Sequence, residues 1–369
     1  MRRCDIIMVT WNQLEYTKLC VESILKNTDV SARLIIVDNG SDPDTVAYLR
    51  SVRPAGNVVI VTIFNTNNIG AIKARNQGIR LLDADYLCFV DNDIEVTKGW
   101  LSRMIALADR YSDIGVVNPS SNNYDEVPPG DVTLEEYAAK LAARRGEYIE
   151  VGQGISFCML VKREVVDKIG LMDEDLDTMF YEDTDYSMRS NAEGYRCVIA
   201  KDVYVWHHGH RTSRNLKKYE TIYHKNRTIF QRKFGRALRV AWFAPQDAAD
   251  PAFKEVLVTA IELAREGDFI YIYYRGQKEM AREEIFRAHG FVEHANVHLK
   301  ICQSASLAWF ALWRVLVRRK KPYGIAVTTD HATARLLKGF ALLHGARVIE
   351  GDDFDEIHEI AHAKKFEGI

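Results

Sequence analysis

The sequence predicts an α/β fold arranged in two domains, and three observations support this prediction. Short apolar runs alternate with amphipathic segments along most of the chain, as expected for strands and helices that build parallel sheets. Acidic residues directly follow several of these runs, at the end of a strand where open α/β sheets bind ligands. A second alternating series begins near residue 238, and 369 residues exceed the usual size of a single hydrophobic core.

Composition restricts the class of protein. Hydrophobic residues make up 47% and charged residues 27% of the chain, which is typical of soluble globular proteins. The formal net charge of −2 argues against nucleic-acid binding, because such proteins carry a basic surplus. The chain shows no apolar run near the roughly 20 residues of a membrane span, no signal peptide and no paired spacing among its six cysteines. We expect a cytoplasmic protein, with contact to the inner face of a membrane as an alternative.

The first part of the chain predicts a strand, a helix and a second strand. Residues 6–10 give the first strand, and Asn12 followed by Glu15 is a helix-start pattern. Residues 34–37 give the second strand, which ends at Asp38. The crossover rule makes the two strands parallel. Asp38 therefore lies at the ligand-binding edge, although Asp-Asn-Gly-Ser is equally typical of a simple turn.

A third strand over residues 58–64 leads into a polar segment and a helix. Asn68 is a candidate helix cap, and Lys73 and Arg75 fall near the helix start. Free amides and cations at a helix N-terminus suit a phosphate group. Neither a P-loop nor a G-x-G-x-x-G pattern is present, so this signal is weak by itself.

Two acids separated by one residue follow the fourth apolar run. Residues 87–90 predict a buried strand that ends at Asp91, and Asp93 lies just beyond it. Two carboxylates directed at one small volume repel each other unless a cation separates them, and Mg2+ or Mn2+ takes such oxygen ligands. A polar turn that closes the strand is the competing interpretation.

The middle of the chain offers two further candidate segments. Gly152 and Gly154 precede a strand that extends to residue 161, either to let a ligand approach the backbone or to form a bend. Residues 181–189 begin an acidic helix in which Asp185 and Arg189 can pair. By spacing alone this helix is more typical of a structural element, because the macrodipole favours acids at a helix start.

A histidine-rich segment follows a short strand. His207, His208 and His210 fit a metal site, but their spacing differs from that of a zinc protease. The basic run over 211–218 suits either a flap over a diphosphate or a solvated helix start.

Four of these segments together resemble a known family. Residues 9–12, 36–41, 68–78 and 90–93 occur in the order and spacing of family 2 glycosyltransferases with the GT-A fold, and they are similar to its rhamnosyl- and galactofuranosyl-transferase-like branch. The resemblance ends near Gly235. It implies a GT-A (Rossmann-like, nucleotide-diphospho-sugar transferase) catalytic domain over residues 1–236 and a separate domain over 237–369.

The resemblance also implies roles for individual residues. The reaction would be inverting, metal-dependent transfer from a UDP- or dTDP-sugar to a hydroxyl of a saccharide, lipid-linked saccharide or other acceptor in surface polysaccharide or glycoconjugate synthesis. The implied catalytic base is Asp183, with Glu182 as the alternative, and the metal, Mn2+ or Mg2+, is held by Asp91, Asp93 and His207, with His208 as the alternative imidazole. Donor-binding residues would be Thr10, Asn12, Asp38, Asn68, Lys73, Arg75, Asp91 and Asn92; acceptor or diphosphate contacts would be Gly154, Phe157, His208, His210 and Arg214.

The second domain reads as a small doubly wound parallel sheet. It shows no Gly-rich phosphate loop and no nucleophile elbow, so we expect a role in structure, assembly or acceptor recruitment. The predicted strands are 240–243, 269–274, 297–301, 324–328 and 347–349, and the predicted helices are 253–265, 278–289, 307–319, 332–344 and one beginning at 353.

Residues 307–321 are apolar and aromatic and then strongly basic. A helix at the interface of an anionic membrane has this composition, as does a helix packed on a parallel sheet. The regular alternation favours burial.

Two other function classes fit less well. A nucleotidyltransferase would carry a Gly-rich loop with Lys or Arg after its first strand, and residues 10–14 lack one. A catalytically silent sugar-nucleotide scaffold or sensor would have no chemical reason to keep Asp91, Asp93 and Asp183. Asp38 suits uracil or thymine equally, because both bases present the same imide N–H.

Overall fold

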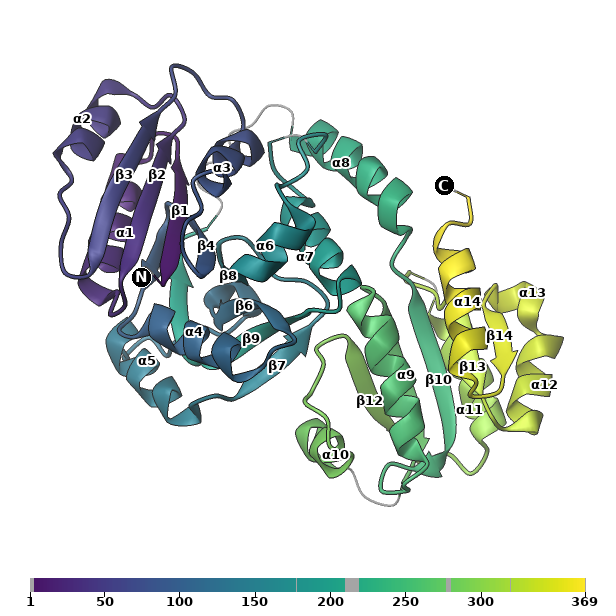
Figure 1. Ribbon diagram of the computed structural model, residues 1–369. Coiled ribbons are helices and arrows are strands. Elements are labelled where there is room, and N and C mark those ends of the chain that lie inside the picture. The colour runs from purple at the N-terminus through teal and green to yellow at the C-terminus, as the bar shows by residue number, and fades with distance from the viewer. Residues whose placement is uncertain (1–2, 177, 210–218, 277–279, 319, 369) are drawn as a thin grey trace. The chain divides into compact units, whose positions relative to one another are not determined.

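The computed structural model describes residues 3–176, 178–209, 219–276, 280–318 and 320–368. The chain divides into two compact units, Met1–Ile149 with Gln153–Phe230, and Glu150–Gly152 with Gln231–Ile369 (Figure 1). The domain boundary inferred after residue 236 stays a prediction. Both units are α/β, as the sequence predicts.

The first unit is built on a nine-stranded mixed sheet. Its order is β3-β2-β1-β4-β8-β6-β9-β5, and β7 pairs with β9 outside this path. The first four strands of this order are parallel, and β8 runs antiparallel to β4. The strands are β1 (Cys4–Thr10), β2 (Ala32–Asp38), β3 (Val58–Phe64), β4 (Tyr86–Asp91), β5 (Ile94–Val96), β6 (Ile114–Ser120), β7 (Tyr148–Val151), β8 (Cys158–Lys162) and β9 (Arg196–His207).

The helices of this unit follow the strands and bury their apolar faces. In α1, for example, Cys20, Val21 and Ile24 recur at helical spacing and are fully buried. The helices are α1 (Leu14–Asn27), α2 (Pro43–Ser51), α3 (Ala71–Ile79), α4 (Trp100–Arg110), α5 (Leu134–Leu141), α6 (Arg163–Ile169), α7 (Glu182–Ala192) and α8 (Tyr219–Phe234), with short 3-10 helices η1 (Asn122–Tyr124) and η2 (Ala142–Arg144).

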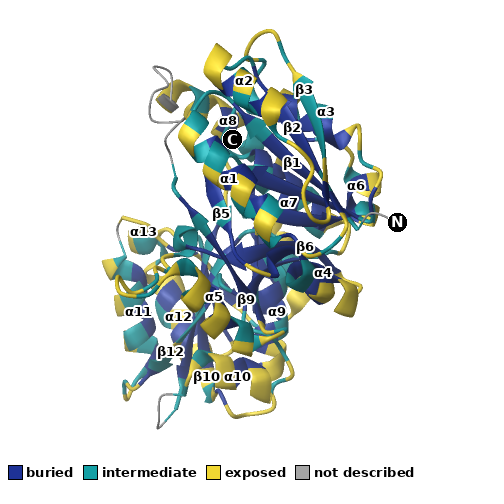
Figure 2. Cartoon of the chain, turned by 90° about the vertical axis from the view of Figure 1, so that its left-hand side faces the viewer, coloured by how far each residue is buried: buried dark blue, intermediate teal, exposed yellow. Residues whose placement is uncertain are grey.

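Strand register places the predicted acids at one edge of this sheet. Thr10 pairs with Asp38 across β1 and β2, and Val9 pairs with Asp91 across β1 and β4. The strand that leads to Asp91 is covered on both faces, since Leu87 to Val90 are at most 1% exposed. Figure 2 shows the same contrast between buried strands and exposed outer helix faces. The carboxyl ends of β1, β2 and β4 therefore meet where a ligand can bind.

Several predicted boundaries in this unit are wrong. The N-cap of α1 is Gln13 in the left-handed region rather than Asn12, and the N-cap of α3 is Gly70, at φ 89°, rather than Asn68. The glycine-led strand begins only at Cys158. The loop before this strand is too tightly packed for a side chain at position 154, because a Cβ on Gly154 would lie 2.6 Å from Asn118 Oδ1.

The second unit is a five-stranded, fully parallel sheet in the order β12-β11-β10-β13-β14. Alternate residues of its central strand enter two different cores, as strand geometry requires. Val240 and Trp242 pack in the core with α9 and α14, whereas Ala241 and Phe243 pack in the core with α11 and α12. The strands are β10 (Arg239–Asp247), β11 (Phe269–Arg275), β12 (Val297–Cys302), β13 (Ile325–Thr328) and β14 (Arg347–Glu350); the helices are α9 (Phe253–Arg265), α10 (Arg282–Ala288), α11 (Leu307–Val317), α12 (His331–Gly339), α13 (Ala341–His344) and α14 (Phe354–Lys365).

The predicted helix over 332–344 is two helices, because the chain departs from helical geometry at Phe340. Acids near the strand ends of this unit serve as helix caps: Asp330 accepts from Thr333 N and Asp353 accepts from Glu356 N. Within the described ranges, none of the helices combines the length and hydrophobicity needed to cross a bilayer.

Candidate active site

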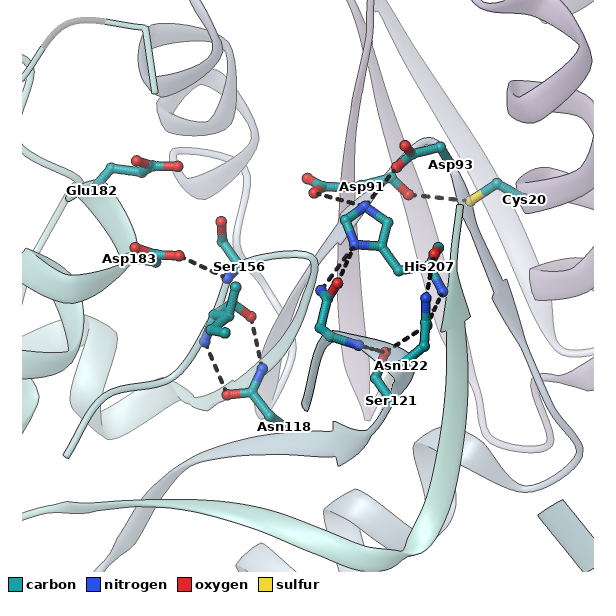
Figure 3. A network of polar contacts seen from close by, with 12 residues as sticks. Cys20, Asp91, Asp93, Asn118, Ser121, Asn122, Ser156, Glu182, Asp183 and His207 are labelled. Carbon is teal, nitrogen blue, oxygen red and sulfur yellow. Dashed lines mark hydrogen bonds and ion pairs between the residues drawn. The ribbon is translucent and has the colours of Figure 1, made fainter. Parts of the chain in front are cut away.

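The edge formed by β4, β5 and β9 gathers three potential metal ligands. Asp91 ends β4, and Asp93 follows in the turn before β5. The pairing of β5 with β9 places Ile94 opposite His207, which brings the imidazole to the acidic turn although the residues lie far apart in sequence. His207 Nε2 is 3.0 Å from Asp93 Oδ1 and 3.8 Å from Asp91 Oδ2 (Figure 3). One ligand atom from each of the three residues lies within 4.8 Å of the others.

Neighbouring groups fix the orientation of the His207 ring. Its backbone N donates to Asn122 Oδ1 at 2.8 Å, and its backbone O accepts from Asn122 Nδ2 at 2.7 Å. Its Nδ1 lies 3.1 Å from the amide oxygen of Asn123, and the ring of Phe157 stacks on it with centroids 5.4 Å apart. When Nδ1–H donates to Asn123, the lone pair of Nε2 faces the two acids, which is the form of histidine that binds metals.

The charges of this group suit a divalent cation. Burial disfavours the His207 imidazolium, but the hydrogen bond to Asp93 and the charges of Asp91 and Asp93 outweigh it and raise the pKa of His207. Burial likewise raises the pKa of Asp91, against the opposing charges of Arg75 and His207. Two carboxylates from a partly buried turn and one buried imidazole are a fitting donor set for Mn2+ or Mg2+. His208, the alternative imidazole, instead lies 2.6 Å from Glu95 Oε1.

Arg75 connects the acidic turn to a second pair of acids. Arg75 is 6% exposed, and its guanidinium lies 2.8 Å from Asp91 Oδ1 through Nη2 and 3.0 Å from Glu182 Oε1 through Nη1. From the sequence we expected Arg75 to bind the phosphates of the donor. In the structure it lies between two carboxylates, because α3 turns this side chain into the sheet edge rather than toward solvent.

The second pair is Glu182 and Asp183, the first two residues of α7. Burial, together with the charge of Asp183, raises the pKa of Glu182 to about 7 against the opposing effect of Arg75. Glu182 Oε2 is buried and has no hydrogen-bond partner among the described residues. Asp183 accepts from Thr184 N at 2.7 Å and from Ser156 N at 3.3 Å, and burial raises its pKa. Perturbed acids in such a position are candidates for proton transfer.

The turn before α7 has an unusual backbone. Thr178, Phe180 and Tyr181 have φ of 41°, 71° and 67°, values that residues with a Cβ seldom adopt. The fully buried Asn226 of α8 donates through Nδ2 to Met179 O at 2.7 Å and Phe180 O at 3.1 Å. This amide therefore holds the turn that leads into Glu182 and Asp183.

The β1–β2 edge contains the residues predicted to bind the donor's base. Asp38 is 1% exposed and accepts from Ser41 N at 3.3 Å. Asn12 donates through its backbone N to Ser41 Oγ and accepts from Asp42 N through Oδ1, both at 2.8 Å. The loop around Asp38 is thereby fixed by the segment that follows β1.

Other predicted donor contacts are engaged within the chain. The Asn92 amide donates to Thr17 at 2.9 Å and to Thr10 at 3.2 Å, and Thr10 is fully buried. Asn68 Oδ1 accepts from Asn39 Nδ2 and Gly70 N, both at 2.9 Å. These side chains therefore brace the loops of the edge, because their polar atoms find partners inside the protein.

The remaining predicted positions are scattered. Lys73 is exposed on α3. Phe157 is 1% exposed, so it supports His207 and offers no surface to an acceptor. Gly154 donates its backbone N to Ser187 Oγ at 2.9 Å. His210 and Arg214 lie outside the described residues.

Sequence reasoning missed three amides and one backbone donor of this site. Asn122 and Asn123 lie between two of the predicted segments and were given no role, Ser156 contributes its backbone N–H, and Asn226 lies within a helix. A pair of asparagines next to a strand was the one signal available, since turn residues often bond to neighbouring backbone.

Comparisons with known proteins find similarity mainly in the first unit. Residues 5–170 match the profile described as Glycosyl transferase family 2. Glycosyltransferase AglE from Haloferax volcanii is 25% identical over 219 residues, which cover 58% of this chain and 69% of that protein. Glycosyltransferase GlyG from Streptococcus pneumoniae serotype 4 is 30% identical over 122 residues, covering 33% of this chain and 40% of that protein.

Among solved structures, the mannosyltransferase PcManGT from Pyrobaculum calidifontis, in complex with GDP-Man and Mn2+, aligns with a TM-score of 0.45 and 16% identity over 57% of this chain and 59% of that chain. Across three curated relatives the matched segment spans 24% to 69% of the relative's own length.

Proposed function

We propose that this chain, whose residues 5–170 match the model of Glycosyl transferase family 2, transfers a sugar from a nucleoside-diphosphate donor to an acceptor hydroxyl with inversion at the anomeric carbon. One observation carries the proposal: Arg75 joins the Asp91, Asp93 and His207 group to the Glu182–Asp183 pair. A group suited to a diphosphate thus lies beside a group suited to proton transfer. The acceptor class we propose is a saccharide or lipid-linked saccharide of surface polysaccharide or glycoconjugate synthesis.

Asp91, Asp93 and His207 would hold Mn2+ or Mg2+. When bound, such a cation supplies Lewis-acid stabilisation of the charge that develops on the departing nucleoside diphosphate. The chain's own contribution is orientation. Asn122, Asn123 and Phe157 fix the imidazole, so little reorganisation is needed when the donor binds.

Asp183 is the proposed general base. An acceptor hydroxyl is a weak nucleophile, and a carboxylate that removes its proton as the new bond forms contributes about 100-fold to about 10,000-fold in rate. The raised pKa of Asp183 makes it a stronger base than an exposed aspartate. Ser156 N and Thr184 N hold the carboxylate in place. Glu182, turned toward Arg75, is the alternative base.

The β1–β2 edge is the proposed site of the donor's base. The Asp38 carboxylate can accept from the imide N–H of uracil or thymine, which favours UDP- or dTDP-sugars. Asn12 and Ser41 fix the loop that positions it.

The proposal is tested with a thermal-shift panel of UDP, dTDP, GDP and CDP, each with and without Mn2+, followed by donor turnover with the stabilising nucleotide. We expect a Mn2+-dependent shift with UDP or dTDP that is lost in Asp93→Ala. Shifts that do not depend on Mn2+, or that persist in Asp93→Ala, would remove the acidic turn from the donor site. A normal shift without turnover on any sugar donor would favour a nucleotide sensor instead.

A further inference from the structure

The α11–α13 region of the second unit has a surface that the proposed chemistry does not use. The sequence favoured burial of α11, and the structure shows burial on one side only. Leu307, Ala311, Leu312 and Val315 face the core. The opposite side exposes large apolar side chains at positions 309, 313 and 317, which recur every four residues and so share one face of the helix.

This exposed face carries tryptophan. Trp309 is 63% exposed, Trp313 53% and Val317 50%. The neighbouring helix α13, which contacts α11, exposes Leu342 completely and Leu343 at 71%. Large apolar side chains exposed on two helices that contact each other are typical of an interaction site.

The same region is strongly basic. Between residues 307 and 349 the chain has eight Lys and Arg residues and one acid, Asp330, whereas the whole chain carries a net charge of −2. Lys320 and Lys321 are exposed directly after α11 and have no ion-pair partner among the described residues. Arg314 and Arg318 donate to the hydroxyls of Tyr273, Tyr323 and Tyr271, which leaves their positive charge uncompensated.

We propose that this surface, defined by Trp309, Trp313, Val317, Leu342, Leu343, Lys320 and Lys321, docks on a bilayer containing anionic lipid. Tryptophan side chains prefer the headgroup level of a bilayer, and an apolar helix face flanked by lysines binds anionic membranes in the interfacial plane. A protein partner fits less well, because lysine is depleted at protein interfaces. Docking at the surface requires no membrane-spanning helix.

The experiment uses the full chain and co-sedimentation with phosphatidylcholine vesicles, with and without phosphatidylglycerol. We expect binding only to the anionic vesicles, a decline with added salt and a blue shift of tryptophan emission. Lys320→Gln with Lys321→Gln should lower the partition coefficient about thirtyfold, since each lysine near an anionic surface contributes about fivefold. Trp309→Ala with Trp313→Ala should lower it about tenfold or more.

The matched control exchanges two exposed cations of the first unit, Arg53→Gln with Lys140→Gln, and should bind as the unchanged chain does. Each variant is checked by thermal melting, which should be unaltered because the exchanged side chains are exposed. The proposal is overturned if the chain stays in the supernatant with anionic vesicles at low salt, or if neither double variant alters binding. It is also overturned if ultracentrifugation without vesicles shows a dimer that Trp309→Ala with Trp313→Ala converts to monomer, since a second copy would then cover the face. None of these readouts depends on sugar transfer.

Discussion

The Asp183 carboxylate is held by two backbone donors, Thr184 N and Ser156 N. Replacing Asp183 with Asn keeps the size and one of those contacts, because an amide has a single acceptor oxygen, and it removes the ability to take a proton. We expect Asp183→Asn to lower kcat by about 100-fold to about 10,000-fold with nearly unchanged donor affinity. Asp175→Asn, an exposed position before α7, is the control. Steady-state turnover and isothermal titration of the donor measure the two effects, and loss of both together would show that Asp183 is not the base.

Glu182 should make stability depend on pH. Its pKa is about 7 in the folded chain against 4.5 for the unperturbed group, so the folded state holds the proton more tightly than the unfolded state. The stabilisation is therefore complete below about pH 4.5 and is lost as the pH rises to about 7, by roughly 1 to 3 kcal/mol. Glu182→Gln should flatten this part of the profile. Urea unfolding at about pH 5 and about pH 8 measures it, and identical profiles for both proteins would contradict the expectation.

At the scale of elements, α8 supports the start of α7 through one amide. Asn226→Ala leaves the carbonyls of Met179 and Phe180 without their buried donor, which costs about 1 to 3 kcal/mol. Because the turn sets the position of Glu182 and Asp183, we expect kcat to fall more than donor affinity. Thr228→Ala, on the exposed side of the same helix, should change neither quantity. If Asn226→Ala and Thr228→Ala lost the same stability and kcat were unaltered, Asn226 would contribute only to helix packing and would not position the turn before α7.

The loop before β8 requires a residue without a side chain at position 154. Besides Asn118 Oδ1, a Cβ there would lie 3.0 Å from Met159 Sδ and 3.1 Å from Val116, so Gly154→Ala forces the loop that presents Ser156 to move. We expect a loss of about 1 to 3 kcal/mol in the free energy of unfolding. Gly130→Ala is the control, because a Cβ there meets nothing within 4 Å. Chemical denaturation compares the two, and an equally stable Gly154→Ala would show that the loop yields without cost.

Across the whole molecule, local pattern was sufficient for the architecture. The apolar run over residues 87–90 predicted a buried strand and placed Asp91 and Asp93 at its end, and strand–helix alternation predicted the parallel sheet of the second unit. The fold class is confirmed in both units. Helix bounds failed where backbone geometry intervened, as at Gly70 and Phe340, because single residues outside regular helical geometry leave little trace in periodicity.

The site was less predictable, because its contacts are non-local. His207 meets Asp93 only through the register of β5 on β9, and the sequence pattern alone left its role open; the family resemblance selected it. Arg75 was assigned to phosphate from its place near a helix start, and only the folded chain shows the two carboxylates on either side. The asparagine pair that includes Asn123 was a weak signal and Asn226 gave none, since amides serve as caps and turns throughout proteins.

The distance in sequence between Asp91 and His207 has a consequence for biosynthesis. A nascent chain cannot complete the three-ligand group until more than half of its 369 residues have been translated, because the pairing of β5 with β9 brings the imidazole to the acidic turn. A fragment that stops before residue 207 keeps both aspartates, yet it lacks the imidazole and the strand pairing that positions it. Such a fragment can offer a cation at most the two carboxylates of this group, and the complete ligand set appears only with the finished sheet.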